Sequence, residues 1–292
     1  MMNSSYLQAS RVMVLRAKSP VDRRRRSLER VNKELSRGNY ETALSLVKQL
    51  KSKHGCLSAF GSAKLLPKKL DMSSKSVLWS LIDSVSTSIE SVYVQEVLSI
   101  SKEEDKTSPE EDWFAVVQHE SGHFLVGYLL GVLPRYYEIP TLEAVRQNVS
   151  CVTGRVEFVG FEFLKQVGAA NQLMKENVHS RMNLSDTRGN ISSKTLNNFS
   201  CVILGGMVAE HLQFGYSEGF YSDIVKLNDV LRWLGFTETE NEAHIRWAVS
   251  NTVSLLHSHK EARVSLAEAM SKAKPISACI EAIESAISRY QI

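Results

Sequence analysis

Residues 108–131 read SPEEDWFAVVQHESGHFLVGYLLG, and this stretch decides the fold around it. It opens like a capped helix, because Ser108 can accept the backbone N–H of Glu111 while Pro109 fits the first helical turn. Apolar residues then fill most positions up to a closing glycine, which is a common helix stop. The pattern predicts one buried helix that begins at about Pro109 and ends at about Leu130.

An HExxH motif, His119-Glu120-Ser121-Gly122-His123, lies in the middle of this helix. Positions four apart share a helix face, so both imidazoles can reach a single metal ion, and Glu120 can take a proton from metal-bound water. A polar cluster inside an apolar helix is costly unless something satisfies it, and a metal ion would do so. The motif points to a zinc peptidase site, and the alternative is a helix with two incidental histidines.

Composition sets the broad class of the protein. The chain has 292 residues, of which 43% are hydrophobic, enough for one large domain or two small ones. Residues 1–70 contain 16 Lys or Arg and four Asp or Glu, whereas the remainder contains 19 and 28. A basic arm therefore precedes an acidic body, and the net charge of +3 gives no reason to expect nucleic-acid binding. The four cysteines form no CxxC pair, so a cysteine-based zinc site is not expected.

The sequence contains no candidate membrane span and one candidate targeting segment. The sequence has no uncharged apolar run as long as the roughly 18 residues that a membrane-spanning helix needs. The most apolar segment, 114–133, contains the polar residues of the motif, so we expect it to be a buried helix and not a membrane span. Residues 1–27 are rich in Arg and Ser, with Asp22 the only acid, a composition typical of an organelle transit peptide. A disordered basic tail is the alternative.

Hydrophobic periodicity predicts a mainly α fold with a small β element. We expect a basic leader over 1–27, a helical N-terminal region with a linker over 28–105, and a helical metallopeptidase domain over 106–292. The expected helices are a hairpin within 28–53, then 77–100, 162–182, 196–214, 222–234 and most of 240–290. Short strands are expected at 136–139 and 154–159, and a linker at 55–74.

A second motif begins about eighty residues after the first. The segment 204–215 contains a Gly-Gly pair and then Ala-Glu-His, and Asp223-Ile224 follows. Together the motifs resemble the peptidase domain of the FtsH family of zinc metalloproteases, which reads HEAGH, then GGxxAEExx(F/Y)G, then an Asp–hydrophobic pair that opens a helix. The resemblance covers roughly 109–235. It implies that His119, His123 and Asp223 are zinc ligands and that Glu120 is the general base.

The chain departs from that family's pattern at several points. Ser121 replaces the usual Ala, His211 replaces the second Glu, and the longer spacing to Asp223 implies an insertion around 140–195. The family's ATPase module and membrane anchor have no counterpart, and no GxxxxGK[ST] P-loop occurs in the sequence. The chain is similar in character to plant plastid FtsH-like proteins that carry only the peptidase part. A chloroplast location is therefore expected, with the mitochondrion as the alternative.

Other polar residues near the second motif have two interpretations. Glu210 can accept a hydrogen bond from a ligating imidazole and so orient it, or it can be a solvated or capping carboxylate. His211 is expected to be structural, and Asp229 to lie on the helix surface. The remaining downstream histidines are expected to be exposed or interfacial: His244, His257 and His259.

Two functions remain open from these patterns. The first is a zinc metalloendopeptidase that hydrolyses unfolded or destabilised proteins, as in plastid quality control. The second is a non-catalytic scaffold or assembly subunit that docks on ATPase-bearing FtsH relatives or forms a homo-oligomer. The intact set of two histidines, one glutamate and one aspartate favours the enzyme, whereas the missing ATPase favours the scaffold.

The missing P-loop generates a prediction about energy coupling. The purified chain should neither hydrolyse ATP nor change its peptidase rate when ATP is added. A stable globular substrate should survive, because it is cut only as fast as it opens locally, while a destabilised form of the same substrate should be cut. The measurement compares both forms with and without ATP. ATP-stimulated degradation of the folded form by this chain alone would contradict the prediction.

Overall fold

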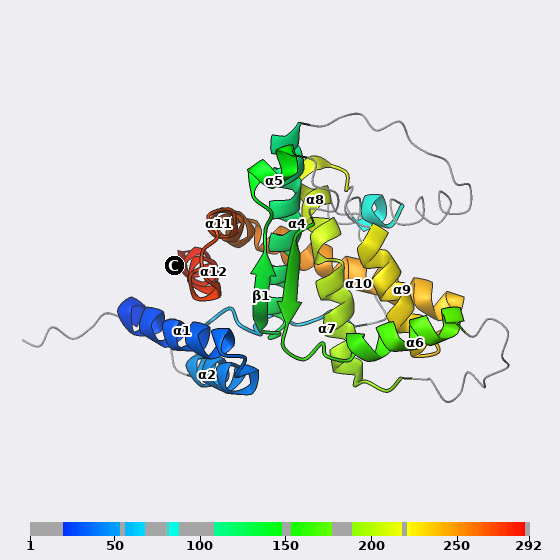
Figure 1. Ribbon diagram of the computed structural model, residues 1–292, viewed down its shortest axis with the longest axis horizontal. Coiled ribbons are helices and arrows are strands. Elements are labelled where there is room, and N and C mark those ends of the chain that lie inside the picture. The colour runs from blue at the N-terminus through cyan, green and yellow to red at the C-terminus, as the bar shows by residue number, and fades with distance from the viewer. Residues whose placement is uncertain are drawn as a thin grey trace, which may run out of the picture.

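The computed structural model describes residues 20–52, 56–67, 80, 82–87, 108–147, 153–176, 189–217 and 221–289. Over these residues the chain is mainly helical with one two-stranded antiparallel sheet, which confirms the predicted fold class (Figure 1). The predicted linker over 55–74 and the predicted helix over 77–100 lie partly outside the described residues. No described helix is long and apolar enough to cross a membrane.

The described elements follow the predicted order with shifted ends, apart from the short helix α5, which is not among the predicted elements. They are α1 (Pro20–Ser36), α2 (Tyr40–Ser52), α4 (Pro109–Leu129), β1 (Pro134–Glu138), α5 (Leu142–Arg146), β2 (Arg155–Phe158), α6 (Leu164–Glu176), α7 (Ser193–Ile203), α8 (Gly205–Phe214), α9 (Tyr221–Trp233), α10 (Glu238–Ser258), α11 (Lys260–Ser271) and α12 (Ile276–Arg289).

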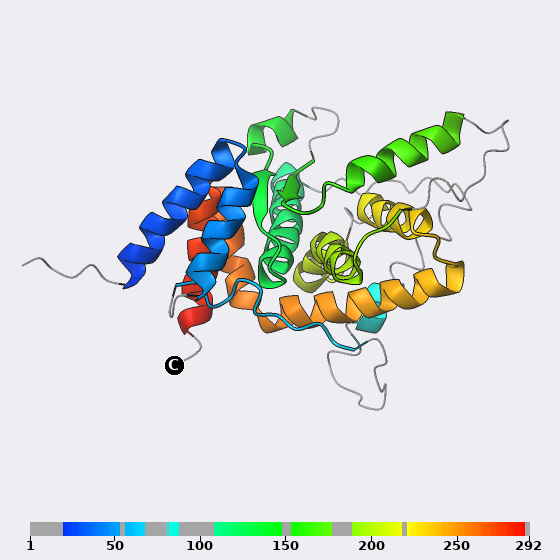
Figure 2. The same ribbon diagram turned by 90° about the horizontal axis from the view of Figure 1, so that it is seen from below.

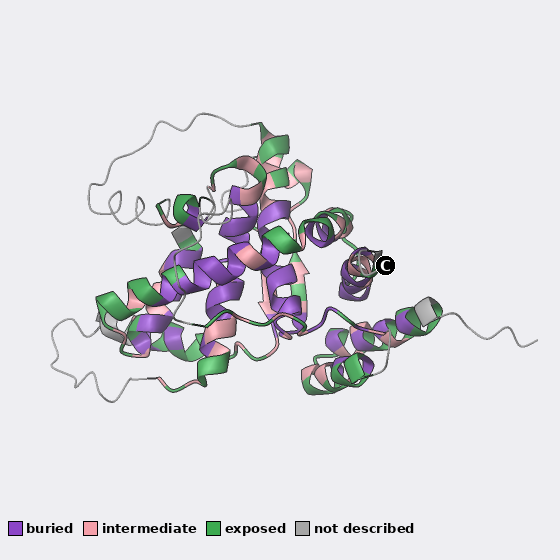
Figure 3. Cartoon of the chain, turned by 180° about the vertical axis from the view of Figure 1, so that it is seen from behind, coloured by how far each residue is buried: buried purple, intermediate pink, exposed green. Residues whose placement is uncertain are grey.

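Helix α4 runs through the middle of the molecule and carries the HExxH motif (Figures 1 and 2). Its start is as predicted, because Ser108 Oγ accepts the N–H of Glu111 while the Glu111 carboxylate accepts the N–H of Ser108. Every residue from Val117 to Leu129 is buried. Figure 3 shows the buried residues, in purple, concentrated where the helices pack together. The helix ends before Gly131, whose φ of +78° is left-handed and favours glycine.

The segment 56–67, predicted as part of a linker, lies across the C-terminal end of α4. The N–H of Gly61 donates to the carbonyl of Tyr128, and the N–H of Ala63 donates to the carbonyl of Leu129. The last carbonyl groups of a helix have no partner within it, so this segment satisfies them. It therefore caps α4 as well as connecting the N-terminal helices to it.

Helix α1 packs against α2 and α12, which joins the N-terminal region to the rest of the described chain. Arg24 is buried and donates to both carboxylate oxygens of Glu281. Glu284 is fully buried and accepts from the backbone N–H of Ala59 and the hydroxyl of Tyr128. Residues 20–27 of the predicted leader are part of α1, and the leader and domain boundaries stay predictions.

Strands β1 and β2 confirm the predicted β element. They pair antiparallel, with Tyr137 opposite Val156 and Glu138 opposite Arg155. The sheet packs closely on α4, because a Cβ atom on Gly127 would lie only 2.2 Å from the Phe158 ring. A glycine at this position of α4 thus makes room for the end of β2.

One predicted element is wrong. The segment 196–214 was expected to be a single helix, but it forms α7 and α8, with a break at Leu204. Helix α8 crosses α4 so closely that a Cβ atom on Gly122 would lie 2.1 Å from the carbonyl oxygen of Gly205 and 2.6 Å from Ala209 Cβ. The break redirects the chain so that α8 can make this backbone contact, which hydrophobic periodicity does not report.

The close crossing predicts a large effect from one methyl group. Gly122→Ala should lower the free energy of unfolding by about 1–3 kcal/mol, because the added carbon would overlap the backbone of α8. Gly168→Ala in α6 is the matched control, since nothing lies within 4 Å of its Cβ position. The control should raise stability by up to about 1 kcal/mol. Urea unfolding monitored by circular dichroism measures the free energy of unfolding of both variants. A Gly122→Ala variant as stable as the wild type would contradict the proposed contact.

Candidate metal centre

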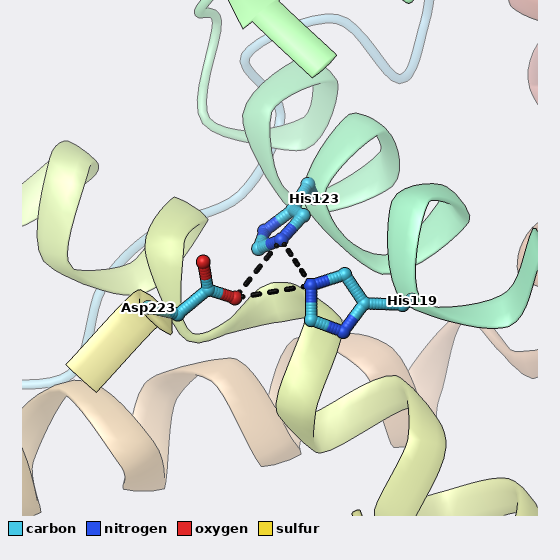
Figure 4. A group of neighbouring side chains, drawn as sticks. All are labelled: His119, His123 and Asp223. Carbon is cyan, nitrogen blue, oxygen red and sulfur yellow. Dashed lines mark hydrogen bonds and ion pairs between the residues drawn. The ribbon is translucent and has the colours of Figure 1, made fainter. Parts of the chain in front are cut away.

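Three buried side chains from two helices converge on one point (Figure 4). His119 and His123 come from α4, and Asp223 comes from the first turn of α9. The two Nε2 atoms are 2.9 Å apart, and Asp223 Oδ2 lies 3.1 Å from Nε2 of His119 and 3.2 Å from Nε2 of His123. The structure therefore brings together the residues that the resemblance implied as ligands, and the cluster could hold a metal ion.

The outer nitrogen of each imidazole contacts an oxygen acceptor. His119 Nδ1 lies 2.6 Å from Glu210 Oε1, and His123 Nδ1 lies 2.7 Å from the carbonyl oxygen of Val202. Contacts this short require a proton on each Nδ1, because a carbonyl oxygen and an ionised carboxylate only accept. The N–H of Gly206 is 3.3 Å from His123 Nδ1, but the shorter carbonyl contact decides the tautomer. In a neutral ring, Nε2 then carries a lone pair.

Three lone-pair atoms thus face one another when both rings are neutral. Asp223 Oδ2 has no well-aligned hydrogen bond, although it is buried. This arrangement is repulsive unless a cation, either a proton or a metal ion, lies among the three atoms. Tetrahedral zinc ligands at about 2.1 Å from the ion are about 3.4 Å from one another, close to the separations observed here. The donor set of His119, His123 and Asp223 therefore fits a divalent ion with nitrogen and oxygen ligands.

Burial and neighbouring charges shift the pKa values of the cluster. Burial lowers the pKa of His119, but the carboxylates of Asp223 and Glu210 outweigh burial, so the net shift is upward. Burial raises the pKa of the Asp223 carboxyl, but the two imidazoles outweigh it and hold that pKa well below its ordinary value. The cluster consequently attracts positive charge, and protons would compete with a metal ion for it.

Glu120 lies beside the cluster with its carboxylate buried. Burial raises its pKa, and its Oε2 atom has no hydrogen-bond partner. A Cβ atom on Gly154 would lie 2.5 Å from Glu120 Cγ, so the residue just before β2 leaves room for this side chain. A buried acceptor without a partner is costly, which is typical of a group that receives a proton from a bound molecule.

A pocket of about 560 Å³ opens onto the cluster. Its lining combines polar residues, among them Glu120, Glu210 and the three converging residues, with apolar and aromatic side chains. The apolar lining consists of Ala115, Val116, Val156, Phe158, Phe161, Leu164, Phe199, Val202 and Ile203. A pocket of this volume with a few convergent polar groups is typical of a small-ligand or substrate site.

Glu210 lies against the imidazole of His119 and is 4% exposed, so it is neither solvated nor a helix cap. Its second oxygen accepts from Ser217 Oγ at 2.6 Å. The Gly-Gly pair makes this approach possible, because a Cβ atom on Gly206 would lie 2.4 Å from His119 Nε2. The contact can hold the Nδ1 proton of His119 and aim Nε2 inward.

The other candidate residues lie outside the cluster. His211 is buried and contacts Ser84 Oγ at 3.0 Å, and burial lowers its pKa. Asp229 pairs with Arg232 on the same helix. His244 is buried where α10 packs on α7 and contacts Ser200 Oγ at 2.8 Å, whereas His257 is exposed and His259 is half-buried.

Sequence reasoning missed Arg263, a fully buried residue of α11. Its guanidinium donates to Gln118 Oε1 at 2.6 Å and to the carbonyl of Ala209 at 3.2 Å. These acceptors directly precede His119 and Glu210, so Arg263 ties α4 to α8 beside the cluster. Burial lowers its pKa. No local signal distinguishes this arginine from one on the exposed face of a helix.

No protein-family model, curated protein or solved structure matches this chain.

The geometry predicts unequal roles for three carboxylates. Asp223→Ala should weaken zinc binding sharply, because only two imidazoles would remain. Glu210→Ala should weaken it by about 10- to 100-fold, because Glu210 contacts a ligating ring and not the ion. Asp229→Ala, on the same helix as Asp223, should leave zinc affinity unchanged. Competition with a chromophoric chelator measures all three, and full zinc affinity in Asp223→Ala with loss in Glu210→Ala would transfer the ligand role to Glu210.

Proposed function

We propose that the protein is a zinc-dependent metalloendopeptidase that hydrolyses peptide bonds in unfolded or destabilised proteins. The observation that carries the proposal is the convergence of two Nε2 atoms and one carboxylate oxygen within 3.2 Å, beside the buried carboxylate of Glu120. A site of two imidazoles and one carboxylate suits zinc, and catalytic zinc sites use three protein ligands with one open position. The HExxH motif and the resemblance to the FtsH family support the same assignment.

Each residue of the site has a role in this proposal. His119, His123 and Asp223 would hold the ion. When bound, zinc would supply Lewis acidity, lowering the pKa of water at its open position to about 7 and polarising a substrate carbonyl. Glu120 accepts the proton of the attacking water at Oε2 and passes it to the leaving amine nitrogen. Glu210 keeps the proton of His119 on Nδ1, so that Nε2 stays available as a ligand atom.

The pocket and the small sheet suggest how a polypeptide would enter. Residues 153–156, just before and within β2, line the pocket. Among the described residues β2 pairs only with β1, so its other edge is free to hydrogen-bond an added extended strand. The apolar lining of the pocket would accept hydrophobic side chains, which folded proteins bury in their cores. This favours unfolded chains as substrates. A role in plastid quality control rests on the resemblance and the basic leader.

The decisive experiment separates the proton acceptor from the ligands. Glu120→Gln should retain about one zinc per chain, because Glu120 is not a proposed ligand, and should lose casein hydrolysis by about 10²- to 10⁴-fold. Glu110→Gln is the matched control, since Glu110 lies exposed in the first turn of the same helix and pairs with Arg146. The control should cleave casein at the wild-type rate.

Two outcomes would overturn the proposal. Wild-type activity in Glu120→Gln would remove the assigned general base. A zinc-loaded wild-type protein that cleaves no unfolded substrate would favour the scaffold, and binding to an ATPase-bearing FtsH relative would then be the activity to measure.

A further inference from the structure

Helix α1 carries a basic stripe on its exposed face, formed by Arg23, Arg26, Arg30 and Lys33. The spacings of three, four and three residues place these side chains on one face of the helix, and all four are exposed. The stripe is about 15 Å long, because ten residues separate its ends at about 1.5 Å per residue. The opposite face packs on the core through Arg24, Leu28, Val31 and Leu35.

Two of the three acidic residues of α1, Glu29 and Glu34, pair with arginines outside the stripe, while the third, Asp22, lies exposed beside Arg23. Glu29 pairs with Arg25 at 3.8 Å, and Glu34 pairs with Arg37 at 3.3 Å, and neither arginine belongs to the stripe. The buried Arg24 has its own partner in Glu281. The basic stripe therefore presents a line of positive charge to solvent.

The position of α1 gives this charge a direction. Helix α1 lies at one end of the molecule, and α6 and α9 lie toward the other (Figures 1 and 2). Residues 71–292 contain 28 Asp or Glu and 19 Lys or Arg, so the body is acidic while α1 is basic. A molecule with this asymmetry turns its basic end toward a negative surface.

We infer that the basic stripe is a docking surface for an anionic lipid bilayer. A straight line of exposed charges can meet a flat headgroup layer along its whole length, whereas the phosphates of a nucleic-acid duplex follow curved strands. Among the side chains of α1 and α2 whose burial the structure describes, none is large, apolar and exposed. The stripe thus lacks the apolar centre of a protein interface and the aromatic platform of a single-strand nucleic-acid site. The contact is electrostatic and lies at the membrane surface.

The size of the effect follows from the number of charges. Each Lys or Arg near an anionic leaflet strengthens binding by about fivefold, so the four residues of the stripe contribute roughly 10²- to 10³-fold. Salt screens such contacts, so binding should weaken steeply between about 50 and 300 mM NaCl. The inference does not depend on the proposed peptidase activity, and it requires that all of α1, including residues 20–27 of the predicted leader, stays part of the chain.

The test is flotation of the full chain with vesicles. Binding is expected with phosphatidylcholine containing about one third phosphatidylglycerol, and not with phosphatidylcholine alone. The double variant Arg26→Gln/Arg30→Gln should bind about 30-fold more weakly. The control Lys165→Gln/Lys194→Gln removes the same charge from exposed positions on α6 and α7 and should bind as the wild type does. Circular dichroism of each variant checks that α1 remains folded, and glutamine maintains helix propensity.

Three results would overturn the inference. Equal weakening in the control pair would show that net charge matters and the stripe does not. Full binding by the folded Arg26→Gln/Arg30→Gln variant would place the contact elsewhere. Absence of vesicle binding, with random-sequence duplex DNA bound at low salt and lost in the same variant, would assign the stripe to nucleic acid.

Discussion

The close crossing of α4 and α8 is the contact on which the rest of the structure depends. Backbone meets backbone where Gly122 faces Gly205, and no larger residue fits there without moving a helix. The crossing brings Glu210 of α8 to 2.6 Å from the His119 ring. Arg263 donates to both helices from α11, one residue before each of these side chains. The geometry of the site therefore depends on the packing of these helices. A shift of α8 would move Glu210 away from His119 and remove the acceptor that fixes the tautomer of that ring.

Two buried polar atoms of the candidate site, one on α4 and one on α9, have no hydrogen bond that offsets the cost of their burial. Glu120 Oε2 and Asp223 Oδ2 are buried without a well-aligned hydrogen bond, and two imidazole lone pairs point at one another when both rings are neutral. Each such group costs free energy in an apolar interior. All of these residues line one pocket, where a metal ion and a substrate could satisfy them. Buried polar groups that lower the stability of the unliganded protein are typical of a binding site, because the bound ion or molecule satisfies them.

Some residues of the candidate site could be predicted from the sequence alone, and others could not. His119, Glu120 and His123 follow from spacing alone, because a helix fixes which residues share a face. Asp223 lies one hundred residues after His123, and only the resemblance to a known motif order suggested it. From the sequence, Glu210 could be either an acceptor for a ligating imidazole or a solvated or capping carboxylate. The structure shows that it accepts from the His119 ring, because α8 turns at Leu204 and lies against α4.

The sequence by itself determined the features that depend on neighbours along the chain. The capping box of α4, its end at Gly131, the two short strands and the mainly helical class all arise from local hydrogen bonding and periodicity. Only the tertiary structure decided the break between α7 and α8, the packing of segment 56–67 across the end of α4, and the burial of Arg263. These features depend on contacts between residues far apart in the chain. The free energy of such contacts comes from surfaces that meet only after folding, so no local pattern contains it.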